Sequence, residues 1–342
     1  MNKSAAKRWG EALEREELAR LIAPAPPVEK EVPSVSVFAP RYVDGYVKAN
    51  RQKPSSISAV EQILRNHIIP AVGDLPLDAV DDEQQQKLKA RLDHLKPKTV
   101  NNVLAVLSGM MTTAVDWKVI PAKPFRLRLL RVPPPLIQFY DFGQLAALIE
   151  ASAKLDPRLH AMVLLGAHAG ARRGEIISQR SHTINFHSNQ IIFDMSDWRG
   201  IEDCPKGGRY RVVPMTKALA EALRACRHLR GERVLYDDDS KPLTPKVVRD
   251  WMKSAQRRAG LKETGGVHIL RHTFCSHLAM RGAPARTIKE LAGHKSMATT
   301  MRYMHLSPGA TDAAIRLLDG ESGDILETEG GVTKKPGVPR GI

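Results

Sequence analysis

The sequence is poor in cysteine and lacks long apolar runs. Three of its 342 residues are cysteine, and no two of them form a CxxC pair. A disulfide framework is therefore not expected, and a reducing cytoplasm is the default location. No stretch approaches the roughly 20 apolar residues of a membrane-spanning helix, and the first residues lack the apolar segment of a signal peptide. The sequence predicts neither a disulfide-stapled miniprotein nor a membrane-spanning protein.

Acidic residues are too few to balance the basic ones. Lys and Arg number 52 against 37 Asp and Glu, so the net charge is +15. Such a surplus favours a polyanionic partner, because a cationic surface neutralises phosphates and releases their counterions. An anionic membrane surface is the weaker alternative, since the sequence has no lipidation motif and no basic amphipathic anchor. The charge therefore points first to nucleic acid.

Common cofactor motifs are also absent. The sequence contains no GxxxxGKS/T loop, no GxGxxG after a strand and no HExxH, so neither a nucleotide nor a dinucleotide cofactor is expected. One group, His272, Cys275 and His277, has the residue types of metal ligands. On a helix, residues 272 and 275 share a face but residue 277 is rotated away, and no fourth ligand is evident. We expect no cofactor and no metal.

The hydrophobic pattern predicts two largely helical domains. Apolar residues recur at helical spacing up to residue 120, and we interpret Met110 and Met111 as core residues. Three short β-prone runs, at 183–186, 190–194 and 210–214, interrupt the later helices, with a long connection over 195–209. The predicted parts are a helix and Pro-rich linker over 1–35, a helical domain over 36–120, a basic Pro-rich linker over 121–140, a second domain over 141–318 and a flexible tail over 319–342.

Four segments of the second domain carry cationic and proton-transfer side chains. They are GARRGEI with Arg172 and Glu175, KGGRYRVVP with Lys206, HILRH with His268 and Arg271, and GHKSMATTMRYMH with His294 nine residues before Tyr303. Taken singly, each has an ordinary structural interpretation as a surface ion pair, a solvent-facing Lys or a Tyr at the edge of a core. Their combination in this order is much less common.

That order resembles the tyrosine recombinase family, which includes phage integrases and Xer-type recombinases. GARRGEI is similar to the GxRxxE box of the family, HILRHTF to its HxLRHTF box, and LAGHKSMATTMRYMH to its LGH box and terminal Tyr. The resemblance covers about residues 36–318. It implies a mainly α protein with an N-terminal helical, SAM-like core-DNA-binding domain. The α-rich catalytic domain is expected to hold a small three-stranded antiparallel sheet.

The resemblance also implies an enzyme, a site-specific DNA recombinase or integrase that works through a 3′-phosphotyrosyl intermediate without ATP or metal. Two guanidiniums can clamp a phosphate whose charge grows in the transition state. A phenol has a pKa of about 10, so ionising it at pH 7 costs roughly 4 kcal/mol and needs help. The expected roles are Arg172 and Arg271 as the clamp, His268 as the base, Lys206 as the acid for the leaving 5′ oxygen, His294 as a phosphate contact, Tyr303 as the nucleophile and Glu175 as a supporting residue.

Several further expectations concern partners. The partner is duplex DNA with a specific recombination site, held in a C-shaped clamp, with the basic linker as a strap along the phosphates. Expected DNA contacts are Lys96, Lys98, Asn101, Asn102, Arg126, Arg128 and Arg173. By the resemblance, the protein is a tetramer in the synapse and a monomer or dimer when free, is associated with the nucleoid, and uses accessory DNA-bending proteins. Residues 309–318 either dock on a neighbouring protomer or pack on their own domain.

The biological role is expected to be integration or excision of a mobile element. Two alternatives remain from the residues: a topoisomerase IB-like enzyme that nicks and reseals DNA, and a catalytically silent DNA-binding protein. Residues 4–22 look like the helix that follows a small arm-site-binding domain in many integrases. Either the element lacks arm sites or that domain is missing from this chain.

Overall fold

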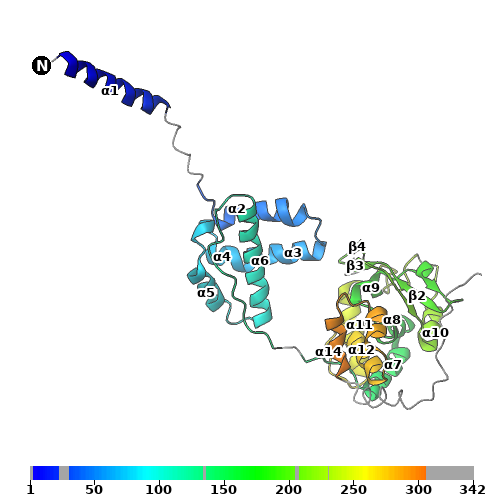
Figure 1. Cartoon of the computed structure of the whole chain (residues 1–342). Helices are drawn as coiled ribbons and strands as arrows, with labels where there is room; N and C mark the ends of the chain where they lie inside the picture. The colour runs from blue at the N-terminus through cyan, green and yellow to red at the C-terminus, as the bar shows by residue number, and fades with distance from the viewer. Residues whose placement is uncertain (1–2, 23–30, 134–135, 205–207, 230, 306–342) are drawn as a thin grey trace, which may run out of the picture. The chain divides into compact units, whose positions relative to one another are not determined.

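The computed structural model describes residues 3–22, 31–133, 136–204, 208–229 and 231–305. The chain divides into two compact units, residues 1–134 and 135–342, and each is described by itself (Figure 1). Within the described residues, no helix is both long and apolar enough to cross a lipid bilayer.

The described part of the first unit is helical. Short π-helical segments follow α2 and α3 directly, with no connecting residues between them. Its elements are α1 (Lys3–Ile22), α2 (Val35–Tyr42), η1 (Val43–Lys48), α3 (Pro54–Ile63), η2 (Leu64–Ile68), α4 (Ile69–Val72), η3 (Leu77–Ala79), α5 (Asp82–Arg91) and α6 (Pro97–Asp116).

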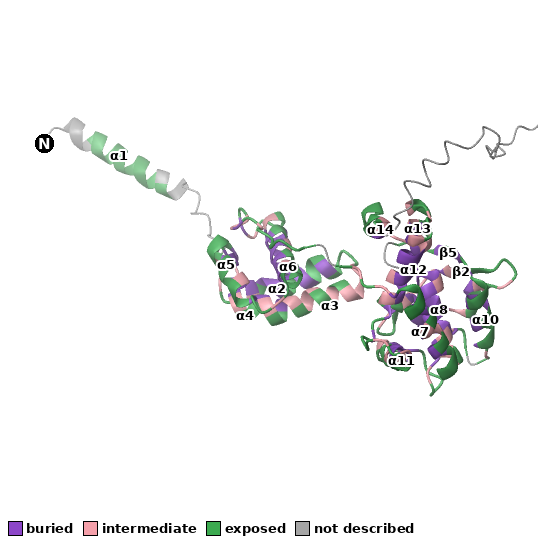
Figure 2. Ribbon diagram, turned by 90° about the horizontal axis from the view of Figure 1, so that it is seen from below, coloured by how far each residue is buried: buried purple, intermediate pink, exposed green. Residues whose placement is uncertain are grey.

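Helix α6 supplies much of the core of the first unit. Its residues Val103, Leu107, Met110 and Met111 are fully buried, and Figure 2 shows buried residues along both α6 and α2. The apolar residues recur every three or four positions, which lines one side of the helix with side chains that leave water on folding. The expected helical domain and the core position of both methionines are confirmed.

Residues 121–130 differ from the expected linker because they pack on the first unit. Phe125 is buried in the core of this unit and Leu127 is half-buried. Arg126, between these two residues, and Arg128, directly after Leu127, are exposed. This alternation is that of an extended segment with one face against the core. The proline and charge content suggested a linker, but the apolar residues between the arginines bind residues 121–130 to the helices.

The buried side chain of Gln85 on α5 fixes this segment. Its Nε2 donates to the Arg126 carbonyl at 3.1 Å, and its Oε1 accepts from the Arg128 N–H at 3.2 Å. Further along, the Asn101 amide donates to the Leu130 carbonyl at 2.9 Å and accepts from the Leu130 N–H at 2.8 Å. Two side-chain amides therefore replace the β-ladder that an extended segment would otherwise need.

The second unit is built around one largely buried helix. Helix α8 is apolar on nearly all sides, as expected for a helix enclosed by others, and it contacts α7, α10 and α12. The elements of this unit are α7 (Phe142–Leu155), α8 (Pro157–Ala169), α9 (Arg173–Ser178), η4 (Ser181–Thr183), β1 (Ile184–Asn185), β2 (Gln190–Phe193), β3 (Ser196–Trp198), β4 (Ile201–Asp203), β5 (Arg211–Pro214), α10 (Lys217–Ala225), α11 (Pro245–Arg258), α12 (His268–Met280), α13 (Ala285–Ala292) and α14 (Met297–Met304).

Two glycines, one within α8 and one directly after it, allow the neighbouring helices to take their positions. A Cβ on Gly166 would lie 2.7 Å from the Cβ of Leu270, so only glycine allows α12 to approach so closely. Gly170 ends α8 in the left-handed region at φ +61°, where glycine is favoured. The chain then turns directly into α9.

The sheet matches the expectation and adds a second hairpin. Strands β1, β2 and β5 form an antiparallel sheet, with Ile191 opposite Val213. The long connection between β2 and β5 contains a separate hairpin of β3 and β4. These strands are short and polar, so no hydrophobic alternation predicted them. Ion pairs hold them instead: Arg233 contacts Asp197 and Glu202, and Arg180 contacts Glu202.

Substitution of Gln85 tests how residues 121–130 are held. Gln85→Ala leaves the Arg126 carbonyl and the Arg128 N–H without their partner, which should lower the free energy of unfolding by about 1–3 kcal/mol. Urea unfolding measures that loss, and amide hydrogen exchange should speed up over 126–130. Gln86→Ala, at an exposed position on the same helix, is the control. Equal effects of the two substitutions would contradict the assignment.

Candidate functional site

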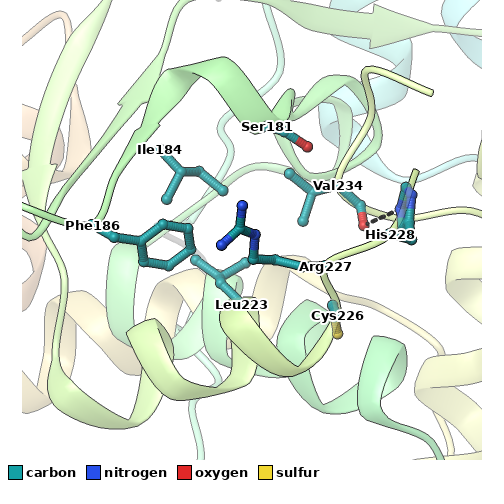
Figure 3. A pocket seen from close by; sticks show the side chains of 8 residues that line it. All are labelled: Ser181, Ile184, Phe186, Leu223, Cys226, Arg227, His228 and Val234. Carbon is teal, nitrogen blue, oxygen red and sulfur yellow. Dashed lines mark hydrogen bonds between the residues drawn. The ribbon is translucent and has the colours of Figure 1, made fainter. Parts of the chain in front are cut away.

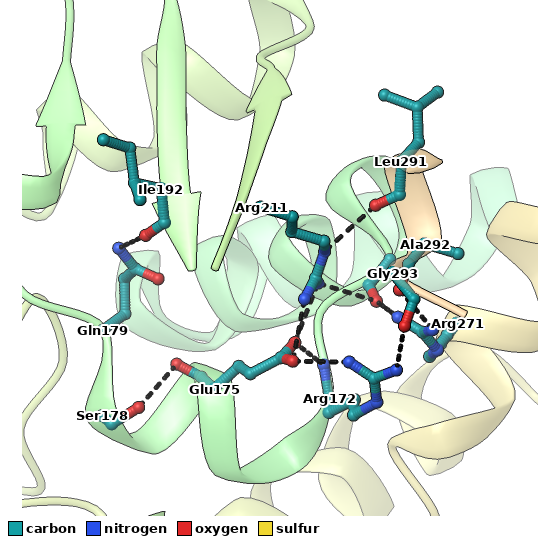
Figure 4. A network of polar contacts seen from close by, with 11 residues as sticks. Arg172, Glu175, Ser178, Gln179, Ile192, Arg211, Arg271, Leu291, Ala292 and Gly293 are labelled. Carbon is teal, nitrogen blue, oxygen red and sulfur yellow. Dashed lines mark hydrogen bonds and ion pairs between the residues drawn. The ribbon is translucent and has the colours of Figure 1, made fainter. Parts of the chain in front are cut away.

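A buried carboxylate gathers two arginines in the second unit. Glu175 on α9 is completely buried. Its Oε1 accepts from Arg172 Nη1 at 2.7 Å and from Arg211 Nη1 at 2.8 Å, and its Oε2 accepts from the Arg172 backbone N–H and from Arg211 Nη2, both at 2.8 Å (Figure 4). Burial acts to raise the pKa of this carboxyl, but the hydrogen bonds and charge of Arg211 and the charge of Arg172 hold it below its usual range. Glu175 is therefore ionised at neutral pH.

Three guanidiniums meet the end of α13. The last carbonyls of a helix have no partner within it and carry partial negative charge, so cations are favoured there. The contacts are Arg211 Nε to the Leu291 carbonyl at 3.0 Å, Arg271 Nη2 to the Ala292 carbonyl, and Arg172 Nη2 to the Gly293 carbonyl at 2.8 Å (Figure 4). Arg271 Nη1 also donates to the Gly170 carbonyl at the end of α8.

The cluster carries more positive than negative charge. Arg271 is 2% exposed, and burial, followed by the charges of Arg172 and Arg211, lowers its pKa to about 10. It therefore remains protonated at neutral pH. The cluster holds three guanidiniums and one carboxylate, that of Glu175, which leaves an excess of two positive charges. A buried excess of this kind favours an anion at its open side.

A basic cleft of about 580 Å³ opens beside this cluster. Its lining is strongly cationic, and Glu290 is its one acidic member among the described residues. The lining residues are Arg172, Arg209, Tyr210, Arg211, Val212, Lys289, Glu290, Gly293, His294 and Lys295. The residues therefore suit an extended polyanion such as a nucleic-acid backbone.

A smaller pocket in the same unit is the weaker candidate (Figure 3). It has a volume of about 200 Å³, and apolar side chains such as Phe186 and Leu223 line much of it. Figure 3 shows Arg227 pointing into it, the one guanidinium among its described lining residues. It lacks the converging charges of the cleft.

His294 follows directly from the anchored end of α13. Gly293 has φ +63°, a left-handed turn that ends the helix and sends the chain to His294. Its Nδ1 lies 2.9 Å from Oγ1 of the fully buried Thr300, so Nε2 is the nitrogen that can meet a ligand. Burial, then the charges of Arg271, Arg172 and Arg211, lowers the pKa of His294 to about 3. It is neutral at physiological pH.

Tyr303 on α14 lies next to this cluster. It is 4% exposed, its ring stacks on His294 with 6.0 Å between centroids, and its Oη lies 2.7 Å from Nδ1 of His272. Burial and the neighbouring Cys275 raise the pKa of Tyr303 to about 12, while Arg271 acts to lower it. The phenol is therefore neutral in the free protein.

The structure brings together most of the predicted site residues. Arg172, Arg271, Glu175, His294 and Tyr303 form one cluster. His268 lies next to it, with its ring 4.8 Å from that of His272. Lys206 lies outside the described residues, so its position stays a prediction.

Sequence reasoning missed Arg211 and His272. Arg211 could have been noticed because β5 alternates, which turns residues 211 and 213 inward together. His272 was weighed only as a metal ligand. Within the described residues, no three His, Cys, Asp or Glu side chains lie close enough to hold a metal ion.

The expected DNA contacts remain predictions, with one change. The exposed side chains are Lys96, Lys98, Asn102, Arg126, Arg128 and Arg173. The Asn101 amide instead binds the backbone of Leu130 in both directions. Its side chain therefore has a structural partner that the sequence did not indicate.

Comparison with curated proteins finds recombinases. The chain is 30% identical over 191 residues to tyrosine recombinase XerD of Rhizobium meliloti, covering 52% of this chain and 58% of that protein. It is 30% identical over 188 residues to XerA of Pyrococcus furiosus, covering 53% and 62%. A tyrosine recombinase of Thermosipho africanus is 25% identical over 195 residues, covering 56% and 66%. The chain thus matches less than two thirds of the length of these relatives.

Solved structures with the same fold include two integrases. The Tn1549 transposon integrase in complex with a circular intermediate DNA superposes with a TM-score of 0.73 at 18% identity, covering 83% of this chain and 99% of that chain. A λ integrase dimer bound to a COC′ core site superposes with a TM-score of 0.64 at 16% identity, covering 90% and 89%. A sequence model of the phage integrase family matches residues 138–309, half of the chain, and these residues hold the Glu175 cluster, the basic cleft and Tyr303. The chain belongs to the phage integrase family.

Proposed function

We propose that the protein is a site-specific DNA recombinase that cleaves and rejoins duplex DNA through a covalent link between Tyr303 and a 3′ phosphate. The observation that carries this proposal is the position of Tyr303, a buried Tyr whose ring stacks on His294, because His294 lines the basic cleft together with Arg172 and Arg211. The names of the curated relatives and the DNA in the related structures support it. Integration or excision of a mobile element stays a prediction from the sequence.

Arg172 and Arg271 are suited to hold the phosphate. A guanidinium has five N–H donors in a fixed plane, and the contacts described above use two N–H groups of each side chain. These contacts fix the plane of each guanidinium and leave further donors for an anion. Preorganised donors of this kind stabilise the charge that develops on the non-bridging oxygens in the transition state.

Tyr303 supplies the nucleophile in this proposal. Its Oη loses its proton and forms a bond to phosphorus while the bond from phosphorus to the 5′ oxygen breaks. The leaving oxygen takes a proton, which we assign to Lys206. Since the phosphodiester energy is kept in the phosphotyrosyl bond, rejoining by the reverse reaction needs no ATP.

Removal of the Tyr303 hydroxyl should abolish covalent attachment. Tyr303→Phe is expected to give no protein–DNA adduct and to bind DNA within a few-fold of the wild type, because the cationic cleft is intact. The DNA substrate is a duplex that Tyr303→Phe selects by binding from a random-sequence pool. A nick is placed in this duplex so that cleavage releases a short fragment and thereby traps the adduct. The covalent adduct is measured on denaturing gels and located by mapping the adducted peptide. Tyr236→Phe, a buried Tyr of the same unit, is the control, and an adduct formed by Tyr303→Phe would refute the proposal.

Loss of an arginine fork should lower the cleavage rate more than DNA binding. Arg271→Lys keeps a positive charge but removes the planar donors, and about a 10²–10³-fold fall in cleavage is expected, with binding changed only a few-fold. Single-turnover adduct formation and a binding titration measure the two effects. The matched control is Arg158→Lys, at an arginine that pairs with Asp156 and Asp238. A variant whose cleavage falls only as far as its binding would argue against a role in the transition state.

The cleft should contribute to the salt dependence of DNA binding. If Lys289 and Lys295 each neutralise one phosphate, each Ala variant should make the slope of log K against log salt concentration less steep by about 0.9. Lys154→Ala is the control, because Lys154 pairs with Glu150 on α7 and does not line the cleft. An unchanged slope in both cleft variants would place the DNA on another face.

A further inference from the structure

The hydroxyl of Tyr303 has a histidine neighbour that was not among the predicted site residues. His272 lies on the first turns of α12, and its Nδ1 is 2.7 Å from Tyr303 Oη. This is a short hydrogen bond to the atom that would attack phosphorus. Burial, then the charges of Arg302 and Arg271, holds the pKa of His272 below its usual value. The ring is therefore neutral, and its Nδ1 accepts while the phenol donates.

The other two histidines of the site are placed differently. His294 has its Nδ1 on Thr300, and its ring lies parallel to that of Tyr303, with an angle of 8° between the planes. It therefore faces the ring of the phenol and the cleft. His268 lies one turn before His272 on α12, is exposed, and contacts the His272 ring edge to face at 4.8 Å. His272 is thus the link between His268 and Tyr303.

We propose that His272 is the group that takes the proton from Tyr303 during strand cleavage, an inference that rests on the proposed function. The Oη–H bond breaks as the bond from Oη to phosphorus forms, and the proton passes to Nδ1 to give an imidazolium. The bond from phosphorus to the 5′ oxygen breaks, and that oxygen takes its proton from the acid assigned above. In rejoining, the imidazolium returns the proton to the departing phenolate.

The surroundings of His272 explain why this transfer would wait for DNA. The charged and titratable groups near it are His268, Arg271 and Cys275 on its own helix, and Tyr303 and Arg302 on α14, with His294 beyond. Arg271 and Arg302 oppose a second positive charge on the ring. A bound phosphate offsets these cations, so the free energy needed to form the imidazolium falls when the substrate is in place.

A further cavity beside His272 offers the proton a route away from the site. His272, His268 and Arg302 line a cavity of about 540 Å³, together with residues of the 136–138 segment and of the loop before α12. The two nitrogens of an imidazole can accept a proton on one side and release one on the other. His268, predicted as the base, becomes in this arrangement the neighbour that accepts or returns the proton at the cavity.

The test uses His272→Asn, because the Asn side chain can still hydrogen-bond the phenol but cannot hold its proton. With the selected nicked duplex, adduct formation at pH 7 should fall by about 10² or more, while DNA affinity and melting temperature stay near those of the wild type. As pH rises, the rate of the variant should increase about tenfold per unit, because hydroxide must then ionise Tyr303. The wild-type rate should level off at lower pH.

The matched control is His160→Asn. Like His272, His160 is half-buried with its Nδ1 on a hydroxyl, that of Ser152 at 3.1 Å, but it does not contact Tyr303. This control should keep both the rate and the pH profile of the wild type. If His272→Asn fails to fold, His272→Gln is measured by the same readouts.

A second substrate separates the nucleophile from the leaving group. A duplex with sulfur in place of the bridging 5′ oxygen has a leaving group that needs no proton. It should restore cleavage by Lys206→Ala and give no rescue of His272→Asn. Three outcomes would each overturn the inference. They are rescue of His272→Asn by the sulfur substrate, a wild-type rate in this variant, and a slow rate with the wild-type pH profile. Failure of the wild-type protein itself to form an adduct would instead refute the proposed function.

Discussion

The arrangement of the second unit depends on the buried ion cluster of Glu175. A carboxylate with no exposure to water is costly unless its charge is paired and its oxygens are hydrogen-bonded. Both conditions are met by Arg172 and Arg211, whose guanidiniums would otherwise repel each other and Arg271. The carboxylate comes from α9, while the guanidiniums come from its N-terminal end, from β5 and from α12. Helices and sheet are therefore tied together at the point where the chemistry is proposed.

The same cluster holds the last residues of α13 in place, and so also positions His294 and Tyr303, which follow it in the chain. Because the guanidiniums donate to main-chain carbonyls, they define the position of the backbone at 291–293 rather than of particular side chains. His294 follows at once, and Thr300 on α14 holds its ring. Tyr303, one turn further on, stacks on that ring. The proposed nucleophile is thus positioned relative to the arginines of the cluster by a short run of chain.

Sequence reasoning identified the residues that carry a strong local pattern. Arg172 and Glu175 sit in a short box after a glycine turn, and His294 and Tyr303 share a fixed spacing on one helix–turn–helix segment. The helical fold and the small sheet follow from periodicity in the same way. Arg211 and His272 were not predicted as site residues because their contacts form only when separate elements meet. Arg211 lies on a strand that meets two helix ends, and His272 lies where α12 meets α14. The β3–β4 hairpin and residues 121–130 escaped because polar contacts, not apolar periodicity, fix them.

The burial of Tyr303 also bears on the chemical durability of the free protein. A phenolate is the form of tyrosine that oxidants and acylating agents attack most readily, and a buried phenol with a pKa of about 12 supplies almost none of it. The proposed nucleophile is thereby shielded in the free protein, where it has no substrate to attack. On the proposed function, the free protein would in this way keep the Tyr303 hydroxyl intact until a DNA substrate binds.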